Sequence, residues 1–240
     1  MAGVKKRRSA MSRVILAVAI VLLVSGVAML SWVAWEMWGT TAVANHQQAS
    51  QVQQLQDQWK SAPQATSTSS AQTPAQGDNV GMLDPDKTPI TIAGQVFGII
   101  RVPDLGADWE KPLVLGTDVT SLTKGIGWDP KTTAIGGVGN AVIAGHHTTY
   151  GAPFLDMTKK MHKGSVVEIE TKDAIYEYAL INDPERTTVT NVDTWVMMPD
   201  PIEKTFNATH HYLTIITCQS IFEGIGRSIA FAELTSVKSK

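Results

Sequence analysis

The chain has 240 residues, of which 43% are hydrophobic and 18% charged, and its formal net charge is −2 with neutral histidines. The part beyond position 35 holds 15 of the 20 basic residues and all 22 acidic ones, which gives it a net charge of −7. A surface with this excess of negative charge repels phosphate, so we expect no nucleic-acid partner.

Residues 14–35 form an uncharged and almost wholly apolar run. As a helix this run is roughly 33 Å long at about 1.5 Å per residue, which is enough to cross a hydrocarbon core of about 30 Å. Trp32, Trp35 and Trp38 lie at the end of the run, where the membrane–water interface on the extracytoplasmic side would be. The run therefore predicts a transmembrane anchor over residues 14–38.

The charges on either side of this run predict its orientation. Five basic residues precede it and Glu36 follows it, so the positive-inside rule keeps a tail of residues 1–13 in the cytoplasm and exports the rest. The expected location is the cell membrane, with a single pass. A cleaved signal peptide is the alternative, because "AVAN" at 42–45 resembles a cleavage site. Against that alternative, the apolar run exceeds the roughly 7 to 15 residues of a signal sequence.

Residues 39–88 are interpreted as an extracytoplasmic stalk or linker. The segment 45–88 holds ten glutamines among Ser, Thr, Ala and Pro, a composition typical of a disordered tether. Ala49, Val52, Leu55 and Trp59 recur at near-helical spacing, so a short helix just outside the membrane is compatible with the first part.

Residues 89–240 are predicted to form one all-β domain, a barrel or a sandwich. Short apolar or alternating runs are separated by Gly, Pro, Asp and Asn, which is the pattern of strands joined by turns. The expected strands are 95–102, 140–144, 165–171, 175–182, 212–217 and 228–234. Short helices are expected at 120–124 and 153–160.

Cys218 is the only cysteine in the chain and follows the β-branched strand 213–217. A lone cysteine is most often a buried, inert residue. Here, however, a loop at 219–226 leads to Arg227 at the start of the next strand, so a hairpin would bring the two side chains face to face. An exported thiol beside a guanidinium favours a reactive thiolate.

A base for this thiol is expected among the histidines. His146 and His147 follow a buried strand and a glycine in "NAVIAGHHTTYGAPF", a position typical of a site wall, and the residues alone do not choose between them. Cysteine, histidine and arginine together can carry out acyl transfer through a thioester.

Three blocks in this order resemble the sortases, the membrane-anchored cysteine transpeptidases of Gram-positive bacteria, and most closely those of actinobacterial class E. The blocks are "GTDVTSLTKGIGWDP" at 116–130, "NAVIAGHHTTYGAPF" at 140–154, and "LTIITC" at 213–218 followed by Arg227. The resemblance extends over about residues 94–234.

The resemblance implies an eight-stranded sortase-type β-barrel with short helices behind one N-terminal transmembrane helix. It implies that the catalytic residues are His146, Cys218 and Arg227. It also implies that Thr217 and Tyr150 bind the substrate, with Tyr150 at the position associated with a preference for LAXTG over LPXTG sorting signals.

The activity that the resemblance implies is cleavage of an LAXTG or LPXTG-like signal after Thr by a Cys218 thioester. The acyl group then passes to a peptidoglycan amine. The partners are secreted proteins with C-terminal sorting signals, the cell-wall amine and membrane lipid. No cofactor and no required metal are expected, and calcium modulation stays open. Two alternatives remain, an L,D-transpeptidase-like cell-wall enzyme and a non-catalytic, membrane-tethered β-domain.

Overall fold

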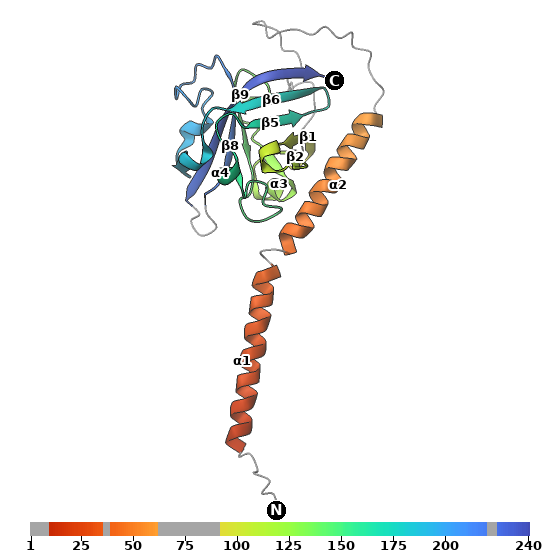
Figure 1. Cartoon of the computed structure of the whole chain (residues 1–240), viewed down its shortest axis with the longest axis vertical. Coiled ribbons are helices and arrows are strands. Elements are labelled where there is room, and N and C mark those ends of the chain that lie inside the picture. Colours follow the sequence, from red (N-terminus) through yellow and green to blue (C-terminus); the bar gives the residue numbers. More distant parts are fainter. Residues whose placement is uncertain (1–9, 36–38, 62–91, 220–224) are drawn as a thin grey trace, which may run out of the picture. The chain divides into compact units, whose positions relative to one another are not determined.

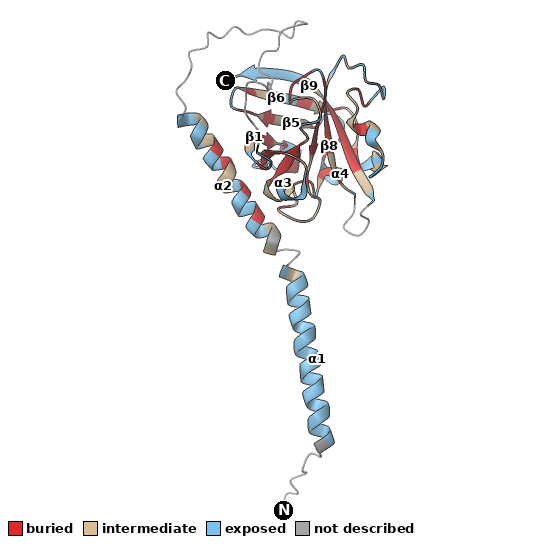
Figure 2. Ribbon diagram, turned by 180° about the vertical axis from the view of Figure 1, so that it is seen from behind, coloured by how far each residue is buried: buried red, intermediate tan, exposed pale blue. Residues whose placement is uncertain are grey.

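The computed structural model describes residues 10–35, 39–61, 92–219 and 225–240, and the chain divides into two compact units, Met1–Thr40 and Thr41–Lys240. In the first unit, helix α1 spans Ala10–Ala34. An 18-residue window within Met11–Ala34 has a mean hydropathy of 2.8, and none of that window is buried in the protein (Figure 2). One N-terminal helix is thus long and apolar enough to cross a membrane, which suggests membrane anchoring.

In the second unit, helix α2 (Thr40–Ser61) occupies the first part of the segment predicted to be a stalk. The helix that the apolar spacing indicated is present, and it buries one face. Val52 and Leu55 are 1% and 8% exposed and pack against Ile99 of the barrel. Buried positions recur along one side of α2 in Figure 2. The predicted linker at 62–91 lies outside the described residues.

Nine strands of the described chain form one sheet that closes on itself (Figure 1). The order β6-β5-β1-β2-β3-β4-β8-β9 is closed by pairing of β9 with β6, and β7 is added at the free side of β9. The predicted eight-stranded barrel is therefore confirmed. Its strands are β1 (Val96–Arg101), β2 (Glu110–Leu115), β3 (Ile126–Trp128), β4 (Gly139–Ala144), β5 (Val166–Glu170), β6 (Ala174–Leu180), β8 (His211–Cys218) and β9 (Gly226–Ser239), with β7 at Thr188–Thr190.

All six predicted strands are present, with ends shifted by one or two residues except in β9, which extends to Ser239. Sequence analysis missed β2, β3 and β7. The last two are three residues long, and β2 contains Pro112, which weakens a strand pattern.

Of the two expected short helices, the one at 120–124 is present in full and the one at 153–160 in part. Helix α3 spans Val119–Lys124. Its N-cap residue is Asp118, whose side chain accepts a hydrogen bond from the Ser121 N–H. Helix α4 covers only Met157–Lys160, because residues 153–156 form turns. The described residues also form three short 3₁₀ helices that the sequence analysis did not predict: η2 (Pro103–Leu105), η3 (Pro184–Arg186) and η4 (Thr194–Met197).

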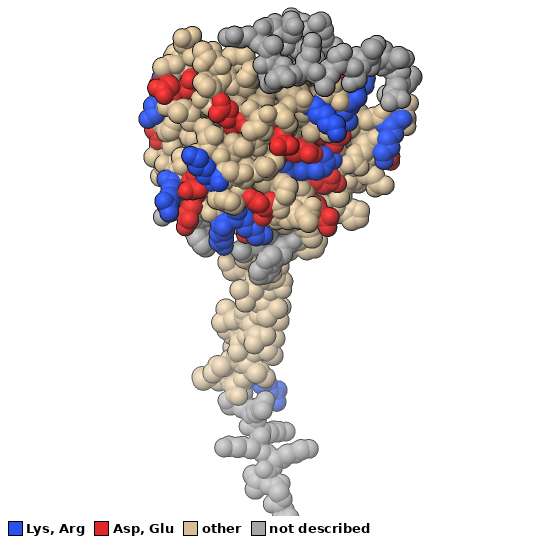
Figure 3. All heavy atoms as spheres, turned by 45° about the horizontal axis from the view of Figure 1, so that its top comes forward, with Lys and Arg blue, Asp and Glu red and all other residues tan. Residues whose placement is uncertain are grey.

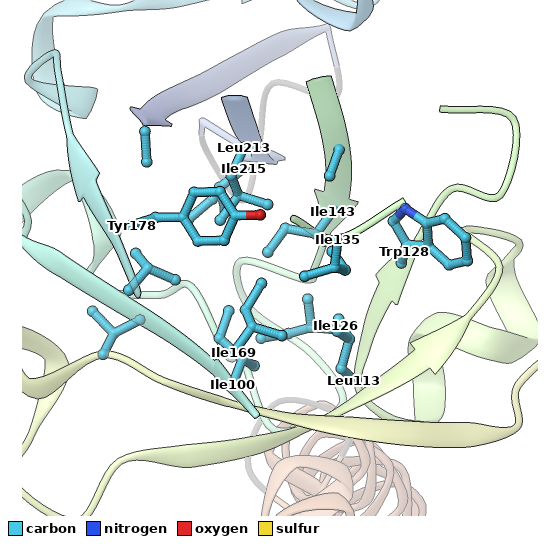
Figure 4. Packing of buried hydrophobic residues seen from close by; sticks show 14 of the residues in the cluster. Ile100, Leu113, Ile126, Trp128, Ile135, Ile143, Ile169, Tyr178, Leu213 and Ile215 are labelled. Atoms are coloured by element: carbon cyan, nitrogen blue, oxygen red, sulfur yellow. The ribbon is translucent and has the colours of Figure 1, made fainter. Parts of the chain in front are cut away.

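The barrel interior is filled by apolar side chains from its strands (Figure 4). Ile100, Leu113, Ile143 and Ile169 are all 0% exposed. Tyr178 lies among them, and its hydroxyl accepts a hydrogen bond from the Gly136 N–H at 2.8 Å. A buried polar group that is satisfied in this way does not weaken the core, so the barrel is a rigid support for the strand ends.

Charged residues of both signs are interspersed on the face of the barrel domain drawn in Figure 3. Independently of that view, Arg101 has acidic neighbours, with its Nη1 2.8 Å from Glu168 Oε1 and 2.7 Å from Glu170 Oε2. Such mixing gives that face no strong field of one sign to attract a charged partner.

Candidate active site

Cys218 and Arg227 are direct partners in the antiparallel pairing of β8 with β9. Residues opposite one another in such a pair project from the same face of the sheet. Both side chains are half-buried, and Arg227 is flanked on its other side by Val189 of β7. The hairpin geometry expected from the sequence is therefore present and places the guanidinium on the same face as the thiol.

The alternation along β8 determines which face this is. Leu213 and Ile215 belong to the barrel interior, whereas Ile216 packs on the outside with Ile229. Cys218 shares the face of Ile216 because side chains alternate with a period of two. The thiol thus lies outside the barrel core, on the face that carries the apolar cluster of Val196, Ile229 and Phe231. It does not have the inert interior position that is usual for a lone cysteine.

His146 is brought to this place by strand β4, which runs parallel to β8. Their pairing ends at Ala144 with Ile216, and the Gly145 N–H still donates to the Ile216 carbonyl at 3.1 Å. His146 follows Gly145 directly, two residues beyond the last pair of β4 with β8, and so begins the loop at the end of β4. Cys218 and Arg227 thus lie at the ends of paired strands, and His146 lies just beyond the end of the strand on the other side of β8.

Thr217 fixes the end of β4 against β8. Its hydroxyl donates to the Gly145 carbonyl at 2.9 Å, and its side chain is 2% exposed. The hydroxyl hydrogen is thus already used within the protein. A contact of Thr217 with substrate through its backbone stays a prediction.

Gly145 is a site residue whose role the sequence analysis did not identify. A Cβ at this position would lie 2.7 Å from two ring carbons of Phe154, and the Phe154 N–H donates to the His146 carbonyl at 3.2 Å. Only glycine allows this close packing. This packing holds the Phe154 segment against the start of the loop that carries His146. The signal lies in the pair Gly145 and Phe154, which are too far apart in sequence to be recognised as a local motif.

Burial lowers the pKa of His146. It also lowers the pKa of His147, with the positive charge of Lys159 acting in the same direction and Asp156 opposing it. Among the described residues, His146 Nε2 and His147 Nδ1 are buried without a hydrogen-bond partner. The two rings differ in their surroundings, since the charges of Lys159 and Asp156 act on His147, whereas the His146 ring lies against Tyr150.

Tyr150 lies against His146, with ring centroids 5.2 Å apart and ring planes at 44°. Its backbone has a φ of 51°, a left-handed value that is rare for residues other than glycine. Gly151 and Ala152 follow with φ of 84° and 39°, so the chain coils tightly here and aims the ring back over the histidine.

Three other described histidines lie away from this site and have polar contacts. His211 Nδ1 is 2.8 Å from the Gly136 carbonyl, His210 Nδ1 is 2.7 Å from Glu233, and His162 is 3.8 Å from Asp104. His46 lies exposed on α2. No group of three or more metal-ligating side chains is found in the described part of the chain.

The arrangement has the parts that acyl transfer requires. A thiol on an accessible face supplies the nucleophile, a largely neutral imidazole can exchange a proton with it or with a leaving amine, and a guanidinium offers a rigid fork of donors for an oxyanion or a peptide carbonyl.

Comparison with known proteins points to one family. The family model described as Sortase domain matches residues 100–235. The chain is 26% identical over 231 residues to sortase SrtE1 of Streptomyces coelicolor. The aligned region covers 93% of this chain and 58% of SrtE1. It is 27% identical over 219 residues to SrtE2 of the same organism, covering 89% and 79% of the two chains. The solved structure of sortase E from Streptomyces avermitilis superimposes with a TM-score of 0.55 at 32% identity, over 62% of this chain and 93% of that chain.

Proposed function

Because the chain belongs to the sortase family, we propose that it is a membrane-anchored cysteine transpeptidase that joins secreted proteins to the cell wall. The observation that carries this proposal is the direct pairing of Cys218 with Arg227, and it is supported by the parallel pairing of β4 with β8, which ends two residues before His146. A structural role for an exported, half-buried cysteine does not require an arginine and a histidine at the same strand ends.

In the first step His146 accepts the thiol proton of Cys218, and the resulting thiolate attacks the threonyl carbonyl carbon of the sorting signal to form a C–S bond. Arg227 donates hydrogen bonds to the signal or to its developing oxyanion. The peptide C–N bond then breaks, and His146 gives its proton to the departing amine. The N-terminal part of the substrate is left on Cys218 as a thioester.

In the second step an amine of a peptidoglycan precursor attacks the thioester carbon. His146 accepts a proton from this amine, the C–S bond breaks and the thiolate is regenerated. No oxidant or metal ion is needed to balance either step. Thr217 supports both steps by holding Gly145, and thereby His146, beside the cysteine.

We further propose that the preferred signal is LAXTG and that Tyr150 contributes to this preference. Alanine at the second position carries a backbone N–H, which proline lacks. A tyrosine hydroxyl near His146 can accept a hydrogen bond from this N–H. An LPXTG peptide cannot donate that bond.

Helix α1 supplies the anchor in this proposal. Its basic flank stays in the cytoplasm, and the barrel faces the cell wall, where both the secreted substrates and the acceptor amine are found.

The test is a transfer assay on the full chain in detergent micelles. A peptide with an LAXTG signal is incubated with an excess of an amine acceptor, and the amide product is quantified. Wild type should form the product, whereas Cys218→Ala should form none and should keep the circular dichroism of the folded barrel. Product formation at the wild-type rate by Cys218→Ala would refute the proposed mechanism.

A further inference from the structure

Helix α2 contacts the segment that carries Tyr150. The side-chain Nε2 of Gln48 donates to the Tyr150 carbonyl at 3.0 Å, although the two residues are 102 positions apart. Gln48 is 1% exposed. A residue from the predicted stalk is thus buried against the loop that follows His146.

The adjacent residue of the loop lies equally close to the helix. A Cβ added to Gly151 would lie 2.8 Å from Gln48 Oε1 and 2.9 Å from Asn45 Oδ1. The glycine also has a φ of 84°, which disfavours any side chain. Two independent requirements therefore select glycine where the loop meets α2.

The orientation of the Gln48 amide is fixed from its other end. Lys111 of β2 donates to Gln48 Oε1 at 3.2 Å and to Asn45 Oδ1 at 2.6 Å. An ammonium group can only donate, so the amide oxygen must point toward Lys111. The amide NH₂ is then left facing the Tyr150 carbonyl. Glutamate at position 48 would preserve the contact with Lys111 but could not donate to Tyr150.

The helix itself is anchored on the barrel, so Gln48 is a fixed support. Val52 and Leu55 pack on Ile99, which is 0% exposed. Further along α2, the Trp59 ring lies 4.0 Å from the Lys240 ammonium. Contacts at three successive turns hold the helix in one place.

Left-handed backbone at Tyr150 and Ala152 is unfavourable for residues with a Cβ and persists only where the surroundings hold it. Gln48 provides such a hold on the carbonyl of Tyr150 itself. The ring of the same residue lies against His146. A change at Gln48 is therefore transmitted to the ring through one backbone unit.

We propose that Gln48 is a positioning residue for Tyr150, and that α2 thereby takes part in setting the substrate preference of the site. This inference rests on the proposed function for its second half, because it assumes that Tyr150 contacts the sorting signal. Its first half, that Gln48 positions the loop at Tyr150, does not depend on which reaction the barrel domain catalyses.

The test compares Gln48→Glu with Gln47→Glu in the full chain in detergent micelles. Gln47 is exposed on the same helix, so the control adds the same charge without touching the loop. Gln48→Met keeps the side-chain length but has neither a charge nor a hydrogen-bond donor, and it serves as a second variant if the glutamate destabilises the domain.

Two measurements test the two parts of the proposal separately: hydrogen exchange tests whether Gln48 holds the loop, and kinetics test whether this affects substrate preference. Hydrogen exchange of backbone amides in residues 147–155 should be faster in Gln48→Glu and Gln48→Met than in wild type, and unchanged in Gln47→Glu. The ratio of kcat/KM for matched LAXTG and LPXTG peptides should fall about threefold to tenfold in the Gln48 variants, the range expected for one hydrogen bond. The Gln47 variant should keep the ratio of wild type.

Exchange at the wild-type rate in both Gln48 variants would overturn the positioning role. Faster exchange with an unchanged ratio would overturn the link to substrate preference. If wild type turned over neither peptide, the proposed function and the link to preference would both fail, and the exchange rates would still decide whether Gln48 holds the loop.

Discussion

Cys218 and Arg227 face one another across the β8–β9 hairpin as the last of seven consecutive residue pairs that begin with Tyr212 and Glu233. A slip of one residue in this register would move one of the two side chains to the opposite face of the sheet. The buried residues at Leu213, Ile215 and Ala230 prevent that slip. The packing of the barrel core therefore fixes the relation between thiol and guanidinium.

Arg227→Lys should lower kcat/KM for the sorting peptide on the order of 10²-fold, even though the charge is retained. The guanidinium presents a rigid fork of donors, whereas an ammonium is a compact point charge. Steady-state kinetics on the full chain provide the measurement. Arg186→Lys, at an exposed position in η3, is the control and should retain wild-type activity. Full activity of Arg227→Lys would show that only charge is required there.

His146→Ala should lose about 10²-fold to 10⁴-fold in kcat/KM, the usual contribution of a general acid or base. His147→Ala should lose less than about tenfold, because its surroundings are those of α4 and not of the cysteine. Both variants are assayed with the same peptide and acceptor amine. Equal losses would mean that the register of β4 and β8 does not select the acting histidine.

The pH dependence of stability follows from the lowered pKa of His146 and His147. The unfolded chain binds protons at these residues near the ordinary pKa of about 6.5, before the folded chain does. The two histidines should therefore contribute to stability above that pH and lose this contribution as the pH falls through about 6.5. In thermal melts, the double variant His146→Asn, His147→Asn should show a smaller drop in Tm between pH 7.5 and 5.5 than wild type. The exposed-site variant His46→Asn should behave as wild type, and an identical drop in all three proteins would contradict the burial argument.

Wild type should prefer LAXTG to LPXTG, and Tyr150→Phe should narrow this preference mainly by slowing the reaction of LAXTG. One hydrogen bond from the alanine N–H, together with the penalty for an unpaired hydroxyl, amounts to about 1 to 3 kcal/mol, or several-fold to a hundred-fold. The measurement is kcat/KM for matched peptides with both enzymes. An unchanged ratio would exclude the hydroxyl as the cause, and a wild-type preference for LPXTG would contradict the proposed signal.

Much of the barrel was predictable because its longer strands carry a local signal. The strand 213–217 is rich in β-branched residues, so its existence could be expected. The loop at 219–226 between it and the next strand indicated a hairpin, so the pairing of Cys218 with Arg227 could be expected as well. Strand β7 could not be predicted, because three residues with one partly buried side chain give no periodicity. It forms only because β9 offers it a free edge.

The contact of α2 with the site was not predictable for a different reason. Gln48 is one of ten glutamines in a segment of polar composition, and nothing local distinguishes it from the exposed Gln47. Its burial depends on Lys111 and Tyr150, which are 63 and 102 positions away. Such a role arises from tertiary contacts alone.

The most direct test of the central claim is intact-mass spectrometry of the full chain after incubation with an LAXTG peptide in the absence of an acceptor amine. We predict a mass increase equal to the peptide up to its threonine, located on Cys218 by digestion, lost on addition of an amine, and absent in Cys218→Ala. An unmodified protein under conditions in which the peptide is cleaved, or an adduct at a residue other than Cys218, would contradict a Cys218 thioester mechanism.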